Sequence, residues 1–220
     1  MAARAGTERH DYRWATQLIE PNTLLSRISV LKPKGRRTLL AIAGPPGAGK
    51  STLAETLVSA LGETAALVPM DGFHIDNRIL ERRGLLTRKG APETFDSSGF
   101  LAMVRRLAED DEVYIPTFDR TKDIAVAGAD VVGPEQSIAV VEGNYLLLGI
   151  APWRGLGDLW DFSVFLDVPM EVLRQRLVQR WLDQGLDSGS AVRRAEVNDL
   201  PNARLVRNWS AAADSVFRTV

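Results

Sequence analysis

The chain contains no cysteine among its 220 residues. Disulfide bonds, thiolate nucleophiles and cysteine-based zinc sites are therefore excluded. Only two histidines are present, and His10 and His74 lie too far apart in sequence to form a local metal-binding motif. No stretch approaches the roughly 20 apolar residues of a membrane span, and the N-terminus lacks the apolar core of a signal peptide. We therefore expect a cytoplasmic protein with no membrane partner.

Neither sign of charge dominates, because 27 Lys and Arg residues face 28 Asp and Glu residues, for a formal net charge of -1. A nearly neutral chain has no overall field that attracts nucleic acid, so we expect no nucleic-acid partner. Any anion must be bound by a local site. With 45% hydrophobic residues, a chain of this length can bury a substantial core without cross-links.

The hydrophobic pattern alternates between apolar stretches typical of buried strands and stretches with helical spacing. Strands are predicted at residues 38–43, 65–70, 113–117, 137–141 and 162–166, and helices at 51–61, 97–108 and 169–183. This alternation predicts an α/β fold with a mostly parallel central sheet. Upstream, Pro21 interrupts the helical spacing over residues 11–31, which predicts two short helices. For residues 124–134 the pattern does not decide between an antiparallel hairpin and a loop.

A glycine-rich turn between the first strand and the first long helix satisfies the P-loop pattern. Its glycines let successive amide groups turn toward phosphate oxygens, Lys50 reaches the β and γ phosphates, and Ser51 can ligate magnesium. The pattern predicts ATP and Mg²⁺ as cofactors. The predicted ATP-binding residues are Gly44, Pro45, Pro46, Gly47, Ala48, Gly49, Lys50, Ser51 and Thr52.

Two carboxylates follow predicted strands, so we expect them at the sheet edge that carries the P-loop. Glu142 comes directly after an apolar strand, where it can organise magnesium together with Ser51. Asp71 follows the strand at 65–70, where it can take the proton from an acceptor hydroxyl that attacks the γ-phosphate. An Asp-Gly pair is also a common turn, so a purely structural role for Asp71 remains the alternative.

Basic residues are expected near the same edge. Arg88 and Lys89 precede the predicted helix at 97–108, and Arg120 follows the strand at 113–117. Such cations can bind an acceptor or the transferred phosphoryl group. His74 is a candidate for substrate contact, with a packed polar ring as the alternative. Together with Asp71, these four residues form the predicted acceptor site.

The helix at 169–183 carries three arginines. Arg176 and Arg180 are four residues apart and share one face, whereas Arg174 points roughly the opposite way from Arg176. We expect Arg176 and Arg180 to stabilise the transferred phosphoryl group, with Lys50 and Asp71 as the other catalytic residues. A solvated basic face that forms salt bridges with neighbouring carboxylates is the alternative.

Residues 39–187 resemble the P-loop kinases that include phosphoribulokinase, uridine kinase and bacterial pantothenate kinase. The resemblance is carried by the P-loop, the arginine helix and the segments at 71–74, 89–96, 116–120 and 140–143. It implies a three-layer α/β/α sandwich of the P-loop NTPase type, a catalytic base at Asp71 and a Walker B acid at Glu142. Residues 1–220 would form one kinase domain, with a helical extension and connector at 1–36, a core at 37–220 and a helical lid around 170–195.

Within that family the chain resembles the fructose transport system kinases, which implies a sugar acceptor. Uridine kinases carry a ribose-binding aspartate where this chain has Gly90, and pantothenate kinases are much longer. We therefore expect a kinase that phosphorylates a hydroxyl of a small molecule, with nucleosides and pantothenate as alternative acceptors. A nucleotide-dependent switch ATPase and a regulatory binding module are the alternatives of another class. A homodimer is also an open alternative.

Overall fold

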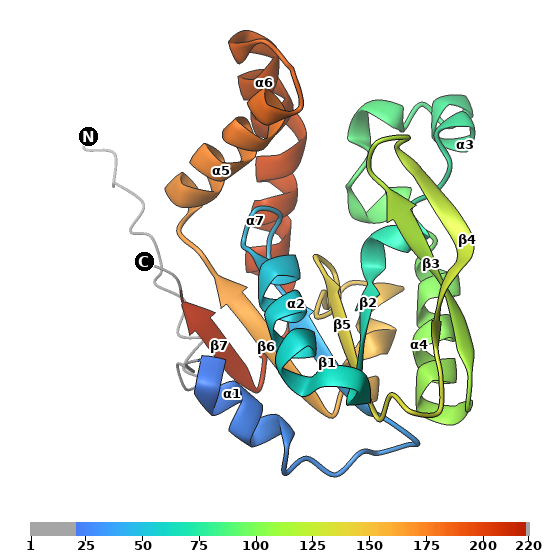
Figure 1. The fold of residues 1–220 in the computed structure, drawn as a ribbon. Coiled ribbons are helices and arrows are strands. Elements are labelled where there is room, and N and C mark those ends of the chain that lie inside the picture. Colours follow the sequence, from blue (N-terminus) through green and yellow to red (C-terminus); the bar gives the residue numbers. More distant parts are fainter. Residues whose placement is uncertain (1–20, 219–220) are drawn as a thin grey trace, which may run out of the picture.

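A five-stranded parallel sheet lies at the centre of the computed structural model, which describes residues 21–218 (Figure 1). Its order is β2-β5-β1-β6-β7, and all four neighbouring pairs are parallel. The strands are β1 (Thr38–Ala43), β2 (Ala65–Pro69), β5 (Ile138–Gly143), β6 (Phe162–Asp167) and β7 (Ser215–Arg218). The carboxyl ends of β1, β2 and β5 therefore meet at one edge, as the sequence predicts.

Helices cover both faces of this sheet because successive residues of a strand point to opposite sides. Leu39 and Ala41 of β1 pack in a cluster with α4 (Ser97–Glu109), whereas Leu40 and Ile42 pack in a second cluster. That second cluster includes α1 (Pro21–Ile28), α2 (Lys50–Leu61) and α5 (Met170–Asp183). The result is the three-layer sandwich with a mostly parallel sheet that the sequence predicts.

Above the carboxyl edge the chain rises on two sides (Figure 1). On one side lie α5, α6 (Ser188–Arg194) and α7 (Leu200–Trp209), with a π-helical turn, η7 (Ala195–Asp199), between the last two. On the other side lie α3 (Asn77–Arg82) and a ribbon formed by β3 (Val113–Asp119) and β4 (Ile124–Val132). These two sides supply the walls of the candidate site.

The sequence analysis is wrong about the strand at 113–117, which does not join the parallel sheet. β3 pairs antiparallel with β4 in a separate two-stranded sheet. The first residues of β3 alternate between buried and exposed, which shows that only one of its faces is covered. The register also shifts between Ile115 and Thr117, on either side of Pro116, which has no backbone N–H to donate. Most of the undecided segment at 124–134 is thereby resolved as β4, the second strand of a hairpin, which ends at residue 132.

The other predicted elements match the structure to within a few residues. The helix expected after Pro21 is α1, which begins at that proline, where a missing N–H costs nothing. The helix expected before Pro21 lies outside the described residues. Between residues 21 and 218, no helix has the length and apolar character that crossing a membrane requires.

Arg37 anchors the base of the sheet although it carries a charge. Only 1% of the residue is exposed, and its guanidinium donates to the carbonyls of Leu107, Asp110, Asp111, Gly133 and Gln136. These carbonyls lie at the end of α4 and in the loops that precede β3 and β5. One side chain just before β1 therefore binds two segments that are otherwise distant from it in sequence, residues 107–111 and 133–136.

We predict that Arg37→Met lowers the free energy of unfolding by about 3–5 kcal/mol, because five carbonyls that are buried or partly buried lose this donor. Urea titration of the intact chain measures the change. Arg36→Met is the matched control, since Arg36 is partly exposed and pairs with the exposed Asp111. It should cost no more than about 1 kcal/mol. Equal losses in the two variants would contradict the anchoring role of Arg37.

Candidate active site

The P-loop connects the end of β1 to α2, and its shape depends on glycine. Gly47 and Gly49 adopt φ values of 80° and 92°, which side-chain-bearing residues rarely adopt. A Cβ on Gly47 would also lie 3.2 Å from the Cγ of Leu177 in α5. Gly49 immediately precedes α2, so the turn presents the positive end of this helix to the cleft. This is the arrangement that binds phosphate groups.

Two buried groups of opposite charge, Lys50 and Glu142, lie where the P-loop meets the end of β5. The Nζ atom of Lys50 donates to the carbonyl of Pro45 at 3.1 Å and to Oδ1 of Asn144 at 2.6 Å. Burial lowers the pKa of Lys50 and raises the pKa of Glu142, while the attraction between the two charges opposes both shifts. Ser51 donates to Glu142 Oε1 at 3.2 Å. A hydroxyl and a carboxylate thus lie together beside the phosphate loop.

Two close backbone approaches place Asp71 at the same edge. A Cβ on Gly72 would lie 2.2 Å from the carbonyl oxygen of Pro116 in β3, and a Cβ on Gly143 would lie 2.5 Å from the Cβ of Met70. Larger residues at either position would push the segment around Asp71 away from β5 and β3. The negative charge of Asp71 accordingly raises the pKa of both Lys50 and Glu142, although burial is the larger influence on each group.

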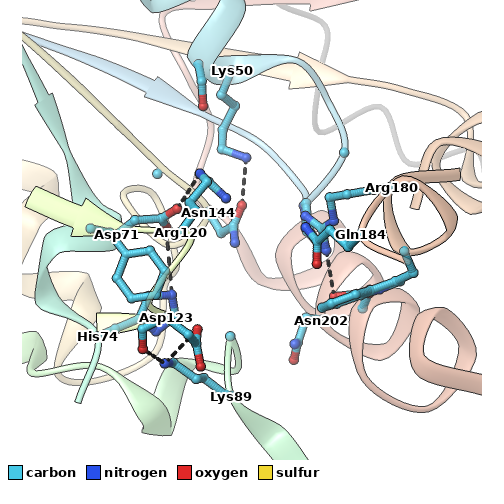
Figure 2. A pocket seen from close by; sticks show the side chains of 18 of the residues that line it. Lys50, Asp71, His74, Lys89, Arg120, Asp123, Asn144, Arg180, Gln184 and Asn202 are labelled. Atoms are coloured by element: carbon cyan, nitrogen blue, oxygen red, sulfur yellow. Dashed lines mark hydrogen bonds and ion pairs between the residues drawn. The ribbon is translucent and has the colours of Figure 1, made fainter. Parts of the chain in front are cut away.

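A cleft of about 810 Å³ opens above these groups. Figure 2 shows Asp71, His74, Lys89, Arg120 and Asp123 on one wall and Arg180, Gln184 and Asn202 on the opposite wall, with Lys50 and Asn144 between them. We name these the acceptor wall and the lid wall. The cleft is therefore bounded by the P-loop below and by segments from both halves of the sequence.

On the acceptor wall the charged side chains are paired. Arg120 binds Asp71, with Nη2 2.8 Å from Oδ2. The Lys89 ammonium lies 2.9 Å from Oδ1 of Asp123, donates to Oδ1 of Asn77 at 2.6 Å and lies over the ring of Phe118. Each cation of this wall thus has a carboxylate partner.

His74 is packed into the acceptor wall between aromatic rings. Its ring stacks on Phe95 with centroids 4.0 Å apart, and the ring of Phe118 lies 4.8 Å away. Burial lowers the pKa of His74 to about 4, so the ring is neutral at pH 7. Its Nε2 is 4.0 Å from Oδ1 of Asp71, while the buried Nδ1 has no hydrogen-bond partner among residues 21–218.

On the lid wall, Arg180 is held by a buried carboxylate. Its Nη2 donates to Oδ1 of Asp199 at 3.2 Å, and Oδ2 of Asp199 accepts a 2.6 Å hydrogen bond from the indole of Trp181. The guanidinium groups of Arg180 and Arg194 each lie 5.1 Å from the ring of Trp181. The cation of Arg180 therefore faces the cleft from a well-supported position.

Of the predicted ATP-binding residues, Gly44, Pro45 and Ala48 do not line this cleft. Two of the predicted catalytic and acceptor residues also lie outside it. Arg176 reaches the outer side of the P-loop, where its Nη1 donates to the carbonyl of Gly47 at 3.3 Å. Arg88 points to solvent and pairs with Glu93 at 3.2 Å. Arg174 also lies outside, where it pairs with Glu196. The other predicted catalytic, metal-binding and acceptor residues, Lys50, Ser51, Asp71, His74, Lys89, Arg120, Glu142 and Arg180, all line the cleft.

The structure adds lining residues that the sequence analysis missed. Those with polar side-chain groups are Asn77, Asp123, Asn144, Trp181, Gln184, Arg194, Asp199 and Asn202. Asn144 could have been found, because it follows the strand that ends in Glu142. The segment containing Asp199 and Asn202 carried no such signal, since no strand or glycine turn marks it and only the course of α6 and α7 returns it to the cleft.

Comparison with known proteins identifies the family. The profile of the Phosphoribulokinase / Uridine kinase family matches residues 39–202. The chain belongs to this family. It is thus an ATP-dependent kinase that transfers a phosphoryl group to a hydroxyl of a small molecule, and this confirms the type of enzyme that the sequence predicts.

Relatives of this kinase differ in their named substrates. It is 34% identical over 208 residues to a candidate uridine kinase of Schizosaccharomyces pombe, across 89% of this chain and 88% of that protein. It is 36% identical over 159 residues to a pantothenate kinase of Nocardioides sp., across 66% of this chain and 47% of that protein. The crystal structure of a candidate fructose transport system kinase from Silicibacter sp. TM1040 superposes with a TM-score of 0.86 at 50% identity, across 90% and 99% of the two chains.

The burial of His74 gives a testable dependence of stability on pH. The pKa of His74 is about 4 in the folded chain and 6.5 when unfolded. Between these two pH values the unfolded state therefore binds more protons at His74 than the folded state does. The contribution of the neutral His74 ring to the free energy of unfolding is fully present above pH 6.5 and is lost as the pH falls toward 4. Lowering the pH from 7.5 to 5 should remove about 2 kcal/mol of unfolding free energy through this residue.

Urea unfolding of the wild type and of His74→Gln at both pH values isolates this contribution, because the carboxylates are common to the two proteins. The wild type should lose about 2 kcal/mol more than the variant. Equal losses would show that the ring of His74 is solvated in the folded protein.

Proposed function

We propose that this kinase transfers the γ-phosphate of ATP to a hydroxyl of a neutral polyhydroxylated molecule, such as a sugar, with Asp71 as the general base. The observation that carries this proposal is the convergence of Asp71, Lys50 and Glu142 at one sheet edge, below an acceptor wall whose cations are already paired. Nothing in the transfer requires a covalent intermediate, because positioning and charge neutralisation supply most of the acceleration.

The residues beside the P-loop fit a magnesium ion bound with the nucleotide. Magnesium prefers oxygen ligands and usually takes only one or two from the protein, with phosphates and water as the others. Ser51 and Glu142 supply a hydroxyl and a carboxylate in contact with each other. The buried Glu142 would gain a counter-charge from the ion. When bound, Mg²⁺ would neutralise charge on the phosphate oxygens.

Side chains and amides of the chain itself bind the phosphates and accept the proton. Lys50 and the P-loop amides bind the β and γ phosphates, and Arg180 stabilises the transferred group from the lid wall. Arg176, which contacts the outside of the P-loop, supports this loop or reaches the phosphates when ATP is bound. Asp71 accepts the hydroxyl proton once Arg120 has turned toward the incoming substrate.

The charge pairing of the acceptor wall supports a neutral acceptor. Arg120 is paired with Asp71 and Lys89 with Asp123, whereas the other cations of the cleft, Lys50, Arg180 and Arg194, lie at the P-loop and the lid. An acceptor that already carried a phosphate would have to compete with Asp71 and Asp123 for these two cations. Asn77, Asp123 and the neutral His74 instead offer the mixed donors and acceptors that bind hydroxyl groups.

The function is tested by ATP consumption with Mg²⁺ across a panel of sugars, polyols, nucleosides, pantothenate and sugar phosphates. We expect a neutral sugar or polyol to raise ADP release and to yield a phosphorylated product. A rate of ATP hydrolysis that is the same with and without every acceptor would instead support the switch ATPase.

With the active acceptor in hand, Asp71→Asn should lower kcat by about a hundredfold or more, because the hydroxyl loses its proton acceptor. The dissociation constant for ATP should change little. Asp130→Asn, on the exposed face of the β3–β4 ribbon, is the matched control and should retain wild-type turnover. Normal turnover of Asp71→Asn would make Asp71 a turn residue and refute its role as base.

A further inference from the structure

The π-helical turn η7 connects the two walls of the cleft. Asn198 and Asp199 are consecutive residues of this turn, and both are buried, with 2% and 7% exposure. Asn198 Nδ2 donates to the carbonyl of Lys89 on the acceptor wall at 2.8 Å. Asp199 binds Arg180 and Trp181 on the lid wall. These two adjacent side chains thus contact the two walls of the cleft, one wall each.

The loop that Asn198 contacts is held at three carbonyls. The guanidinium of Arg194 donates to the carbonyl of Thr87 at 2.7 Å, and the hydroxyl of Tyr145 donates to the carbonyl of Gly90 at 2.6 Å. Gly90 itself adopts a φ of 99°, a conformation that residues with side chains rarely adopt. Two of the three donors, Arg194 and Asn198, come from the lid side of the molecule.

We propose that Asn198 is a positioning residue that couples ATP binding at the lid wall to the acceptor loop at residues 87–90. This inference rests on the proposed function, because it takes Arg180 as a contact of the nucleotide. When Arg180 is drawn toward phosphate, its bond to Asp199 changes, and η7 transmits the change to the carbonyl of Lys89 through Asn198. ATP thereby orders the loop that holds Lys89 and Gly90 before the acceptor binds.

The place of η7 between α6 and α7 is what makes this connection direct. Consecutive side chains of a helix diverge by about 100°, so two neighbouring residues can reach different partners. Asn198 reaches the acceptor loop, while Asp199 lines the cleft and binds the lid wall. A π-helical turn is rare and recurs at functional sites.

Hydrogen exchange of the full chain with and without the magnesium complex of AMP-PNP, a non-hydrolysable ATP analogue, tests the coupling without knowledge of the acceptor. In the wild type the analogue should slow exchange in peptides that cover residues 86–94 by about fivefold or more, the lower end of usual coupling between sites. Several amides there, including those of Lys89, Gly90 and Ala91, are hydrogen-bonded and report on local order.

In Asn198→Asp, which replaces the donor to Lys89 by an acceptor of the same size, the analogue should bind with unchanged affinity but no longer slow this exchange. Arg194→Gln changes a less buried donor to the same loop and should weaken the protection of residues 86–94 by the analogue. This second variant keeps the test possible if Asn198→Asp does not fold. Arg174→Ala is the matched control, since Arg174 binds Glu196 of the same turn but contacts neither wall. It should behave as the wild type.

Full protection of residues 86–94 in Asn198→Asp, or no protection in a wild type that binds the analogue, would overturn the coupling while leaving the proposed function intact. Failure of the wild type to bind the analogue would overturn both. Once the acceptor is known, Asn198→Asp should raise the acceptor KM about fivefold or more with the ATP KM unchanged, a split that general destabilisation does not produce.

Discussion

The site depends on keeping an ammonium and a carboxylate out of water at one edge of the sheet. Burial disfavours the charged forms of both Lys50 and Glu142, and each is stabilised by the charge of the other and by Asn144 or Ser51. Desolvated charges interact strongly with any further charge that enters, because the local dielectric is low. A phosphate chain with its magnesium ion would therefore be bound tightly and in one orientation. The close approaches at Gly72 and Gly143 maintain this geometry by holding β2, β3 and β5 together.

The two walls above this edge differ in how their charges are satisfied. The acceptor wall balances its cations internally, with Lys89 on Asp123 and Arg120 on Asp71. The lid wall presents Arg180 on a single carboxylate, Asp199, which it shares with Trp181. Lys89 is enclosed by several partners, since it also donates to Asn77 and lies over the ring of Phe118. Arg120 and Arg180, in contrast, each bind one carboxylate. An anionic ligand would therefore displace the partners of Lys89 less readily than the partner of Arg120 or Arg180.

Local sequence predicts those parts of the site that a strand end or a glycine turn places. Glu142 lies at the end of β5, Asp71 lies just after β2, and Lys50 follows β1 through the P-loop. The parallel sheet therefore brings the three residues to one edge. The sequence could not show that Arg88 faces solvent while its neighbour Lys89 faces the cleft, because that choice depends on the backbone of Gly90 and on donors from distant segments. It also could not place Asn198 and Asp199, since a π-helical turn has no recognisable sequence pattern. The error about β3 came from treating every apolar stretch as a strand of the parallel sheet, although the alternating burial of a one-sided strand is a different pattern.

The separate β3–β4 ribbon explains how one phosphate site can serve different acceptors. Phe118, Arg120 and Asp123 reach the cleft from this ribbon and its turn, and His74 packs against it. Because the ribbon pairs with no strand of the central sheet in the described part of the chain, its side chains and length can change without disturbing the register of β1, β5 or the P-loop. The lid contacts the acceptor loop through backbone carbonyls, which any residue provides, so that connection also tolerates changes in acceptor side chains. Relatives named for different substrates can thus keep the same donor site while the acceptor wall changes.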